Sequence, residues 1–332
     1  MSFVLVCGGA GYIGSHMCKL LARAGRTPVA FDNLSTGHRR AVRWGPLLEA
    51  DLLDPEALAD AFRSYRFDAV MHFAARSLVG ESVREPGLYF RNNVTGTLNL
   101  LDAMRDAGVL RLVFSSTAAV YGIPDSTPID ETHPTRPVNP YGWSKLMAER
   151  EIAEYCRAHG LRAACLRYFN AAGADPEGEC GEAHEPETHL IPNVLRAALD
   201  PSLGPVKLFG NDYDTADGTC VRDYIHVSDL CDAHLRALDF LDDNPGRHVF
   251  NLGTGHGHSV AQVLAACQAE CGGKPAAVYE ARRPGDPPAL VAGNALASEL
   301  LQWRPQASMG DCVSSALAWH RRQMESTANV PA

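Results

Sequence analysis

The stretch that decides the fold is Phe3-Val4-Leu5-Val6-Cys7-Gly8-Gly9-Ala10-Gly11-Tyr12-Ile13-Gly14, near the start of the chain. Its apolar run predicts a buried strand, and the amphipathic segment after the glycines predicts a helix. Gly8, Gly11 and Gly14 fit the pattern G-x-x-G-x-x-G, and G-x-G-x-x-G fits as well. Glycines at this spacing permit a tight turn and a close approach of the backbone to a pyrophosphate, with N–H donors at the helix start. By itself the triplet is a weak signal, because a purely structural turn can use the same residues.

A second apolar strand, Pro28-Val29-Ala30-Phe31, ends at Asp32. An acid about 20 residues downstream of such a glycine turn binds the adenosine ribose hydroxyls. The same carboxylate repels a 2'-phosphate, so the sequence predicts NAD rather than NADP as the cofactor. The loop that leaves this strand offers Ser35 and Thr36 to the same ribose.

The composition excludes several classes of protein. With 332 residues, of which 46% are hydrophobic, the chain can build a large core, and two lobes are expected at this length. The formal net charge of -9 argues against a nucleic-acid-binding protein and against binding to an anionic membrane surface. Since no apolar run reaches the roughly 18 residues of a membrane span and no signal-type segment opens the chain, we expect a cytoplasmic protein.

The sequence predicts no metal site. The ten cysteines contain no C-x-x-C pair, and Cys267 and Cys271, one helical turn apart, lack a nearby histidine pair. Residues 212–217 are acidic but lack the closing glutamate of an EF-hand. Reduced, mostly buried thiols are therefore expected.

Further apolar strands alternate with helical segments, which predicts a doubly wound parallel α/β sheet of the Rossmann type. One weak strand ends at Asp51-Leu52, where Asp51 either meets the adenine edge or caps a turn. Another, Ala69-Val70-Met71-His72-Phe73-Ala74-Ala75, runs into small residues that let a flat cofactor lie close. A third, Arg111-Leu112-Val113-Phe114, precedes three hydroxyl residues, 115–117. Parallel sheets bind ligands at the carboxyl ends of their strands, so these hydroxyls either contact a ligand or satisfy a turn.

The chemistry is predicted at Asn139-Pro140-Tyr141-Gly142-Trp143-Ser144-Lys145. Pro140 suits the first turn of a helix, which we expect to run to about His159. Tyr141 and Lys145 then share a helix face, and the ammonium lowers the phenol pKa from about 10, so that the tyrosine can act as a base near neutral pH. Such pairs are common on ordinary helices, so this interpretation depends on the cofactor site and on Thr117 as a hydroxyl partner.

In this order, the glycine turn, Asp32, the hydroxyl residues and Y-x-x-x-K resemble the extended short-chain dehydrogenase/reductase superfamily, and finer matches resemble its UDP-glucose 4-epimerase family. The resemblance covers essentially the whole chain. The matching runs are Asp32-Asn33-Leu34, His72-Phe73-Ala74, Val79-Gly80-Glu81-Ser82, Asn92-Asn93-Val94, Leu166-Arg167-Tyr168-Phe169-Asn170, Phe209-Gly210-Asn211-Asp212-Tyr213-Asp214-Thr215, Asp217-Gly218-Thr219, Val221-Arg222-Asp223-Tyr224-Ile225-His226-Val227 and Arg283-Pro284-Gly285-Asp286.

The resemblance implies an NAD-dependent enzyme that interconverts UDP-galactose and UDP-glucose at C4, with Tyr141, Lys145 and Thr117 as its catalytic residues. It implies cofactor contacts from Gly8, Gly11, Tyr12, Ile13, Gly14, Asp32, Asn33, Leu34, Ser35, Thr36, Gly37, Asp51, Leu52, Phe73, Ala74, Ala75, Ser77, Asn92, Thr117, Tyr141, Lys145 and Phe169. It implies substrate contacts from Thr117, Tyr141, Asn170, His189, Leu190, Phe209, Arg222, Arg283, Asp286 and Leu290. Among these, Asn170, Arg222 and Arg283 are expected at the diphosphate, and Asp286 at the uridine ribose.

The resemblance also implies how the chain is organised. Residues 1–172 are expected to form the NAD-binding Rossmann domain, with residues 225–252 packing back onto it. Residues 173–332 are expected to form a smaller mixed α/β domain for the UDP-sugar. A homodimer joined through the helices of Asn92 and Tyr141 follows from the resemblance alone.

The sequence departs from the family pattern at several positions. Thr117 replaces a serine but keeps the hydroxyl, Ser77 replaces a common lysine, and Gly293 replaces a frequent aspartate. Leu290 stands where some members carry a tyrosine that limits the size of the sugar, so a UDP-N-acetylhexosamine or UDP-pentose 4-epimerase stays open as an alternative. Ala118-Ala119 occupy the place of the acid pair of a 4,6-dehydratase, which argues against that reaction. A non-catalytic NAD-sensing module is a further alternative, although it needs none of the three catalytic residues.

Overall fold

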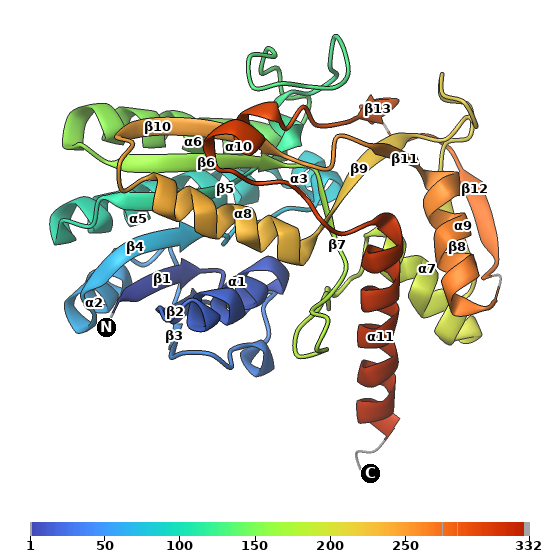
Figure 1. Ribbon diagram of the computed structural model, residues 1–332, viewed down its shortest axis with the longest axis horizontal. Coiled ribbons are helices and arrows are strands. Elements are labelled where there is room, and N and C mark those ends of the chain that lie inside the picture. The colour runs from blue at the N-terminus through green and yellow to red at the C-terminus, as the bar shows by residue number, and fades with distance from the viewer. Residues whose placement is uncertain (1, 274, 284, 329–332) are drawn as a thin grey trace.

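A parallel sheet of seven strands forms the larger part of the protein (Figure 1). The computed structural model describes residues 2–273, 275–283 and 285–328. The strand order is β10-β6-β5-β4-β1-β2-β3, which is the doubly wound Rossmann order with a seventh strand at one edge. The strands are β1 (Phe3–Cys7), β2 (Thr27–Asp32), β3 (Leu47–Glu49), β4 (Phe67–His72), β5 (Arg111–Thr117), β6 (Arg162–Tyr168) and β10 (Gly246–Leu252). The predicted fold class is confirmed.

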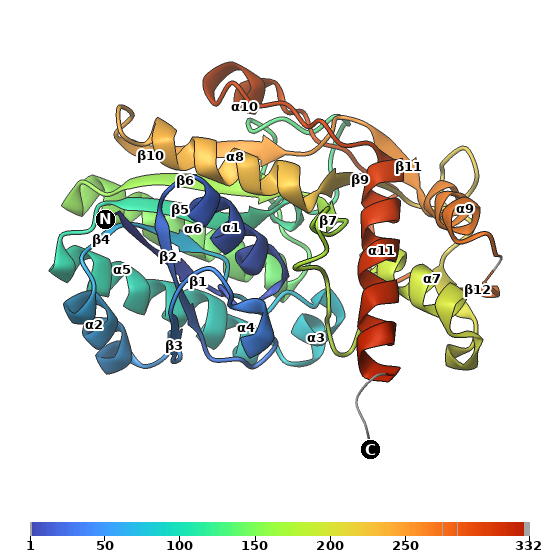
Figure 2. The same ribbon diagram turned by 60° about the horizontal axis from the view of Figure 1, so that its bottom comes forward.

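Helices cover both faces of this sheet (Figures 1 and 2). One face packs against α1 (Tyr12–Arg23) and α8 (Val227–Phe240). The other packs against α2 (Pro55–Ser64), α5 (Gly96–Ala107) and α6 (Pro140–His159). Alternate residues of a strand point to opposite faces, so Val4 and Val6 join the first core while Leu5 and Cys7 join the second. This is why the strands are apolar at consecutive positions. Short helical segments connect these elements: η1 (Arg39–Ala41), α3 (Val79–Arg84), α4 (Pro86–Tyr89), η2 (Phe90–Thr95) and η3 (Ala118–Val120).

The helix that carries Tyr141 and Lys145 begins and ends where the sequence predicts. The Asn139 side chain accepts a hydrogen bond from the backbone N–H of Gly142, and Pro140 occupies the first helical position. Gly160 ends the helix in the left-handed conformation, with φ 71°. These caps place Tyr141 in the first turn of α6.

The smaller part of the protein is built around a third apolar core. A four-stranded sheet contains β7 (Asn170–Ala172), β9 (Val221–His226), β11 (Gly257–Ser259) and β13 (Ala289–Leu290), and β8 (Val206–Phe209) pairs with β12 (Ala277–Glu280). The accompanying helices are α7 (Leu190–Leu199), η4 (Pro201–Leu203), α9 (Val260–Cys271), α10 (Ala295–Leu300) and α11 (Met309–Ala328). After β9 the chain returns to the large sheet through α8 and β10, before it comes back to β11 (Figure 1).

All ten cysteines are free, and eight of them are buried, as expected of thiols that pack as small hydrophobic groups. Among the described residues, no helix is long and apolar enough to cross a membrane.

Candidate active site

The glycine turn between β1 and α1 is closed too tightly for side chains at three of its positions, Gly8, Gly9 and Gly14. Gly8 has φ +79°, and a Cβ atom at Gly14 would lie 2.0 Å from the carbonyl oxygen of Gly8. Gly11 is the residue before α1, and a Cβ there would lie 3.3 Å from that same oxygen. The first-turn N–H groups of α1 have no side-chain cap, so they are available to an anion. The turn therefore fits the pyrophosphate of a dinucleotide.

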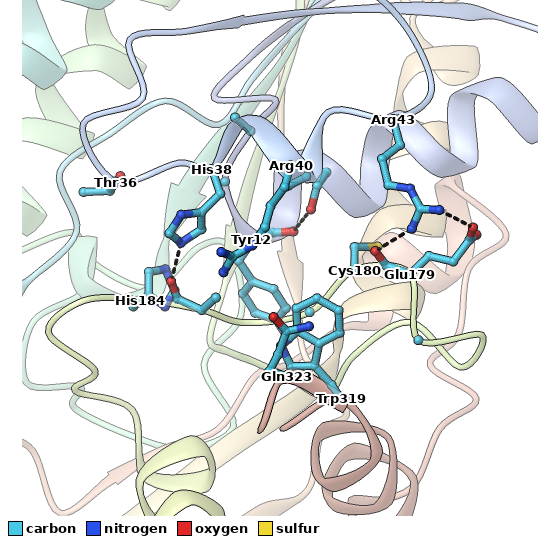
Figure 3. A pocket seen from close by; sticks show the side chains of 17 residues that line it. Tyr12, Thr36, His38, Arg40, Arg43, Glu179, Cys180, His184, Trp319 and Gln323 are labelled. Atoms are coloured by element: carbon cyan, nitrogen blue, oxygen red, sulfur yellow. Dashed lines mark hydrogen bonds and ion pairs between the residues drawn. The ribbon is translucent and has the colours of Figure 1, made fainter. Parts of the chain in front are cut away.

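A cavity of about 240 Å³ adjoins this turn. Figure 3 shows Tyr12 and Thr36 on its wall, together with His38, Arg40 and Arg43 from the loop after β2. The opposite wall is formed by residues 178–184 and by α11. The two arginines are not among the residues predicted from the sequence, and Arg43 forms an ion pair with Glu179 of the opposite wall at 3.2 Å.

Asp32 is fixed at the end of β2 by the backbone. Its Oδ2 atom accepts a hydrogen bond from the N–H of Ala10 at 2.9 Å, and its Oδ1 atom accepts one from Leu34 at 2.9 Å. Burial raises the pKa of this carboxyl, and the two backbone hydrogen bonds oppose the rise. Asn33 donates to Asp51 at 2.8 Å, and Asp51 also accepts from the N–H of Leu53. The turn-capping role of Asp51 is thus present, and its contact with adenine stays a prediction.

The other expected cofactor residues gather near the same edge of the sheet. Phe73 and Ala74 donate their N–H groups to the carbonyl of Cys7, at 2.8 and 3.0 Å, which ties the end of β4 to the end of β1. Asn92 donates to the side chain of Asn93, which also accepts from the N–H of Arg76. Of the remaining candidates, Leu52 is buried, Ala75 is half-buried and Ser77 is exposed. Gly37 lies against Ala10, the backbone N–H of Ser35 donates to the Asn33 side chain at 3.0 Å, and Ile13 packs against the first core.

Two of the three expected catalytic residues are in contact where β5 ends and α6 begins. The side chain of Thr117, the last residue of β5, is hydrogen-bonded to the side chain of Tyr141. Burial raises the pKa of the Tyr141 phenol, and the hydrogen bond with Thr117 opposes the rise. The expectation that Lys145 holds this pKa below its ordinary value is therefore wrong for the protein without bound ligands. Burial disfavours the charged phenolate, and this is the largest influence on the pKa of Tyr141.

Lys145 is one of the largest fully buried side chains. Its Nζ atom donates to the carbonyl oxygen of Ser115 at 2.8 Å and lies 4.8 Å from the centroid of the Phe114 ring. Burial lowers the pKa of Lys145 to about 7, while the nearby Glu149 carboxylate acts in the opposite direction. This amine is therefore close to changing its charge at neutral pH.

Sequence reasoning missed a buried charged network behind Lys145. Glu149 accepts from Arg167 Nε at 2.8 Å, from Arg167 Nη2 at 2.6 Å and from the Ser116 hydroxyl at 2.6 Å. Arg167 also donates to the Tyr121 hydroxyl at 3.0 Å. The network joins α6 to β5 and β6, so it fixes the helix of Tyr141 against the sheet. The sequence shows only that Glu149 lies one helical turn after Lys145, which does not reveal its pairing with Arg167.

Four of the ten expected substrate residues form a second group on β9, on β13 and in the loop before β13: Arg222, Arg283, Asp286 and Leu290. Arg222 is buried, donates to the carbonyl of Pro287 at 2.9 Å and pairs with Asp286 at 2.5 Å. The Arg283 guanidinium lies over the Phe209 ring, 4.1 Å from its centroid. Leu290 is the β13 residue paired with Arg222.

Leu290 connects this group to the catalytic helix. Together with Phe169 it packs against a small apolar cluster that includes Leu146 of α6. Asn170 opens β7, opposite Tyr224 of β9. Leu290 and Phe169 therefore lie near α6, whereas the contact of the expected substrate residues with a UDP-sugar stays a prediction.

His189 and Leu190 lie elsewhere, at the start of α7. His189 Nδ1 lies 2.7 Å from a carboxylate oxygen of Glu182 and 2.9 Å from one of Glu187. Burial alone would lower the pKa of His189, but the two carboxylates outweigh it and raise the pKa to about 10. Leu190 packs against the third core. Their predicted contact with the nucleotide is not shown by these interactions.

Three comparisons with known proteins agree with this geometry. The UDP-glucose 4-epimerase of Rhizobium leguminosarum bv. trifolii is 51% identical over 320 residues, which are 96% of this chain and 97% of that protein. The crystal structure of UDP-glucose 4-epimerase from Brucella ovis in complex with NAD is 48% identical with a TM-score of 0.93, over 96% of this chain and 98% of that one. The enzyme from Bifidobacterium longum in complex with NAD+ and UDP is 36% identical with a TM-score of 0.93, over 97% and 99%. Residues 4–253 match the NAD dependent epimerase/dehydratase family. The chain therefore belongs to the NAD dependent epimerase/dehydratase family.

Proposed function

We propose that this protein is an NAD-dependent UDP-glucose 4-epimerase that interconverts UDP-galactose and UDP-glucose in galactose metabolism. The observation that carries the proposal is the hydrogen bond between Tyr141 and Thr117 at the end of β5. The glycine turn and Asp32 lie at the carboxyl ends of β1 and β2, on the same edge of the sheet. The name shared by relatives that match the whole chain supports the same reaction.

Tyr141 is proposed to remove the proton from the 4-hydroxyl of the sugar, either directly or through Thr117. Bound NAD supplies a nicotinamide that takes the hydride from C4 and later returns it. The resulting 4-keto sugar is planar at C4, so the configuration inverts when the opposite face of the sugar is presented. The same tyrosine then returns the proton to the oxygen, and the reaction is redox-neutral.

Burial works against the phenolate that this reaction needs, so the site must supply positive charge nearby. Lys145 is buried one helical turn from Tyr141, and burial lowers the pKa of its amine to about 7. We propose that Lys145 holds a ribose hydroxyl of the cofactor and favours ionised Tyr141 once the site is filled. A favourable charge near the phenolate contributes most when water is excluded.

The sugar ring must rotate to present its opposite face to the nicotinamide while the UDP part of the substrate stays bound. Arg222 presents a buried guanidinium, which grips a diphosphate better than a lysine does because its donors form a planar fork. Arg222 forms an ion pair with one carboxylate oxygen of Asp286. We propose that this ion pair orients the Asp286 carboxylate toward the uridine ribose. Asn170 and Arg283 are proposed to complete the diphosphate site. Binding energy concentrated on UDP retains the 4-keto sugar without holding the ring in one orientation.

The test is to mix the purified protein, without added NAD, with UDP-galactose and to measure UDP-glucose. A 4-epimerase with retained cofactor forms UDP-glucose, and a non-catalytic NAD-sensing module forms none. UDP-N-acetylgalactosamine and UDP-arabinose assayed in parallel address the alternatives that Leu290 leaves open. Equal or faster turnover of either would move the assignment to a 4-epimerase of that sugar.

We propose that the protein is a homodimer joined through α6 and its neighbours. Trp143 and Met147, one turn apart on α6, are exposed, and so are Val79 and Val83 of the adjacent α3. Apolar side chains gathered in this way favour association. Light scattering coupled to size-exclusion chromatography should give twice the chain mass, and a monomer at micromolar concentration would contradict the proposal.

A cytoplasmic location stays a prediction.

A further inference from the structure

Two histidines and two glutamates converge just before α7, in the segment that links the two parts of the protein. They are Glu182, His184, Glu187 and His189, and one ligand atom from each lies within 4.8 Å of the others. The two carboxylate side chains are almost fully buried, with 6% and 2% exposed, whereas the imidazoles of His184 and His189 are 29% and 42% exposed. The cluster thus consists of two buried carboxylates and two partly exposed imidazoles.

The two imidazoles and the two carboxylates share a small number of polar contacts. His189 Nδ1 lies 2.7 Å from Glu182 Oε1 and 2.9 Å from Glu187 Oε1, and His184 Nδ1 lies 2.9 Å from the same Glu182 oxygen. A ring nitrogen carries at most one proton, so a single N–H cannot point along both directions at His189. The two buried carboxylates each offer an oxygen within 4.8 Å of the other, so positive charge between them would be stabilising.

We propose that these four residues form a binding site for a divalent transition-metal ion, with Zn²⁺ as the best match. Two imidazole nitrogens and two carboxylate oxygens are ligands that zinc accepts in a tetrahedral site. Atoms bound at about 2.1 Å to a tetrahedral ion are about 3.4 Å apart. The nitrogen–oxygen separations run from 2.7 Å to the 4.0 Å between His184 Nδ1 and Glu187 Oε2, and all four ligand atoms lie within 4.8 Å of one another, so an ion would require side-chain rotations that bring these distances toward about 3.4 Å.

The backbone that carries these ligands is already held in place. The Trp319 indole donates to the carbonyl of Glu182 at 2.9 Å, and the ring of His38 contacts the carbonyl of Ala183 at 2.7 Å. Both contacts line the cavity beside the glycine turn, where Figure 3 shows His38, His184 and Trp319 on facing sides. Ligands fixed in this way lose little freedom when an ion binds.

The position of the site indicates a structural role. The His184 ring packs edge-on against Tyr12 of α1, with ring centroids 6.2 Å apart, and His189 is the residue before α7. A bound ion would therefore join the segment beside the glycine turn to the start of a helix in the smaller part of the protein. The sequence expectation of no metal rests on the cysteines and on residues 212–217, and neither argument covers the run Glu182-Ala183-His184-Glu185-Pro186-Glu187-Thr188-His189.

The test uses holoenzyme that has been treated with a chelator and then titrated with Zn²⁺ or Co²⁺. We expect one ion per chain and the visible absorption of tetrahedral Co²⁺, without the sulfur-to-cobalt band that a cysteine ligand gives. His184→Ala and the isosteric Glu182→Gln should each weaken binding at least tenfold, while His256→Ala, at an exposed loop histidine, should not change it. Circular dichroism checks that the variants are folded.

Three results would overturn the proposal. They are no stoichiometric binding by the wild-type holoenzyme, binding that both folded variants retain, and a Co²⁺ spectrum with a sulfur band. The wild-type measurements decide the matter even if one variant does not fold. Loss of epimerase activity plays no part in this test, so its outcome is independent of the proposed function.

Discussion

Replacing Glu149 with glutamine removes one charge from a pair buried between α6 and the sheet. The Glu149 side chain is 1% exposed and that of Arg167 is 6% exposed. Two hydrogen bonds join them, at 2.8 and 2.6 Å, and Ser116 donates a third to the same carboxylate at 2.6 Å. The variant leaves the Arg167 guanidinium buried without an opposing charge.

The expected loss of stability follows from that burial. Removing one partner of a buried ion pair costs about 3–5 kcal/mol of unfolding free energy, because the remaining charge is desolvated and uncompensated. Glutamine keeps one carbonyl acceptor, so the lower end of this range, about 3 kcal/mol, is expected. With a urea slope of about 3 kcal/mol per molar, the midpoint of unfolding falls by about 1 M.

The assay is urea unfolding of the holoenzyme at pH 7, followed by far-UV circular dichroism. Glu154→Gln is the matched control, because Glu154 lies on the same helix in an exposed ion pair with Arg157 and its loss should cost less than about 1 kcal/mol. Equal midpoints for the two variants would refute the reasoning, since burial would then contribute nothing to the difference.

Other predictions follow from burial and close packing. Folding lowers the pKa of Lys145 from 10.5 to about 7, so the unfolded chain binds this proton more tightly than the folded chain does. The protonated amine therefore lowers the free energy of unfolding by its full amount below pH 7, and this loss of stability disappears as the pH rises toward 10.5. Lys145→Met should therefore raise the free energy of unfolding above that of the wild type by more at pH 7 than at pH 10, and the two differences should differ by at most about 5 kcal/mol. Chemical denaturation at both pH values measures this, and a difference between variant and wild type that does not change with pH would contradict the prediction. Gly14→Ala places a Cβ 2.0 Å from the Gly8 carbonyl and should lower NAD affinity at least tenfold in a fluorescence titration, whereas Gly80→Ala meets nothing within 4 Å and should not; equal affinities would show that the turn tolerates the clash.

Local sequence signals predicted the elements that position the site. The apolar runs gave the strands because each is buried on both faces, and Asn139 with Pro140 gave the start of α6 because both residues satisfy an otherwise open helix end. Such signals involve neighbours in sequence, so they can be seen without the structure.

The network behind Lys145 and the pKa of Tyr141 could not be predicted in this way. Glu149 and Arg167 come from different elements, and each looks like an ordinary surface charge in the sequence. The direction of the Tyr141 pKa depends on how much water the fold removes from the phenol, a quantity that the spacing of Tyr141 and Lys145 does not contain. The convergence of Glu182 and His189 likewise depends on how the loop between them is folded.

The turnover of Tyr141→Phe tests the central claim most directly. Tyr155→Phe is the control, because it removes a phenol oxygen from the same helix, where that oxygen donates to Asp102 rather than lying beside Thr117. With UDP-galactose as substrate, Tyr141→Phe should retain NAD and bind UDP but lose about 10²–10⁴-fold in kcat, the contribution of a positioned general base, while Tyr155→Phe stays near the wild-type rate. A Tyr141→Phe variant that turns over within threefold of the wild type would contradict the assignment of this tyrosine as the base.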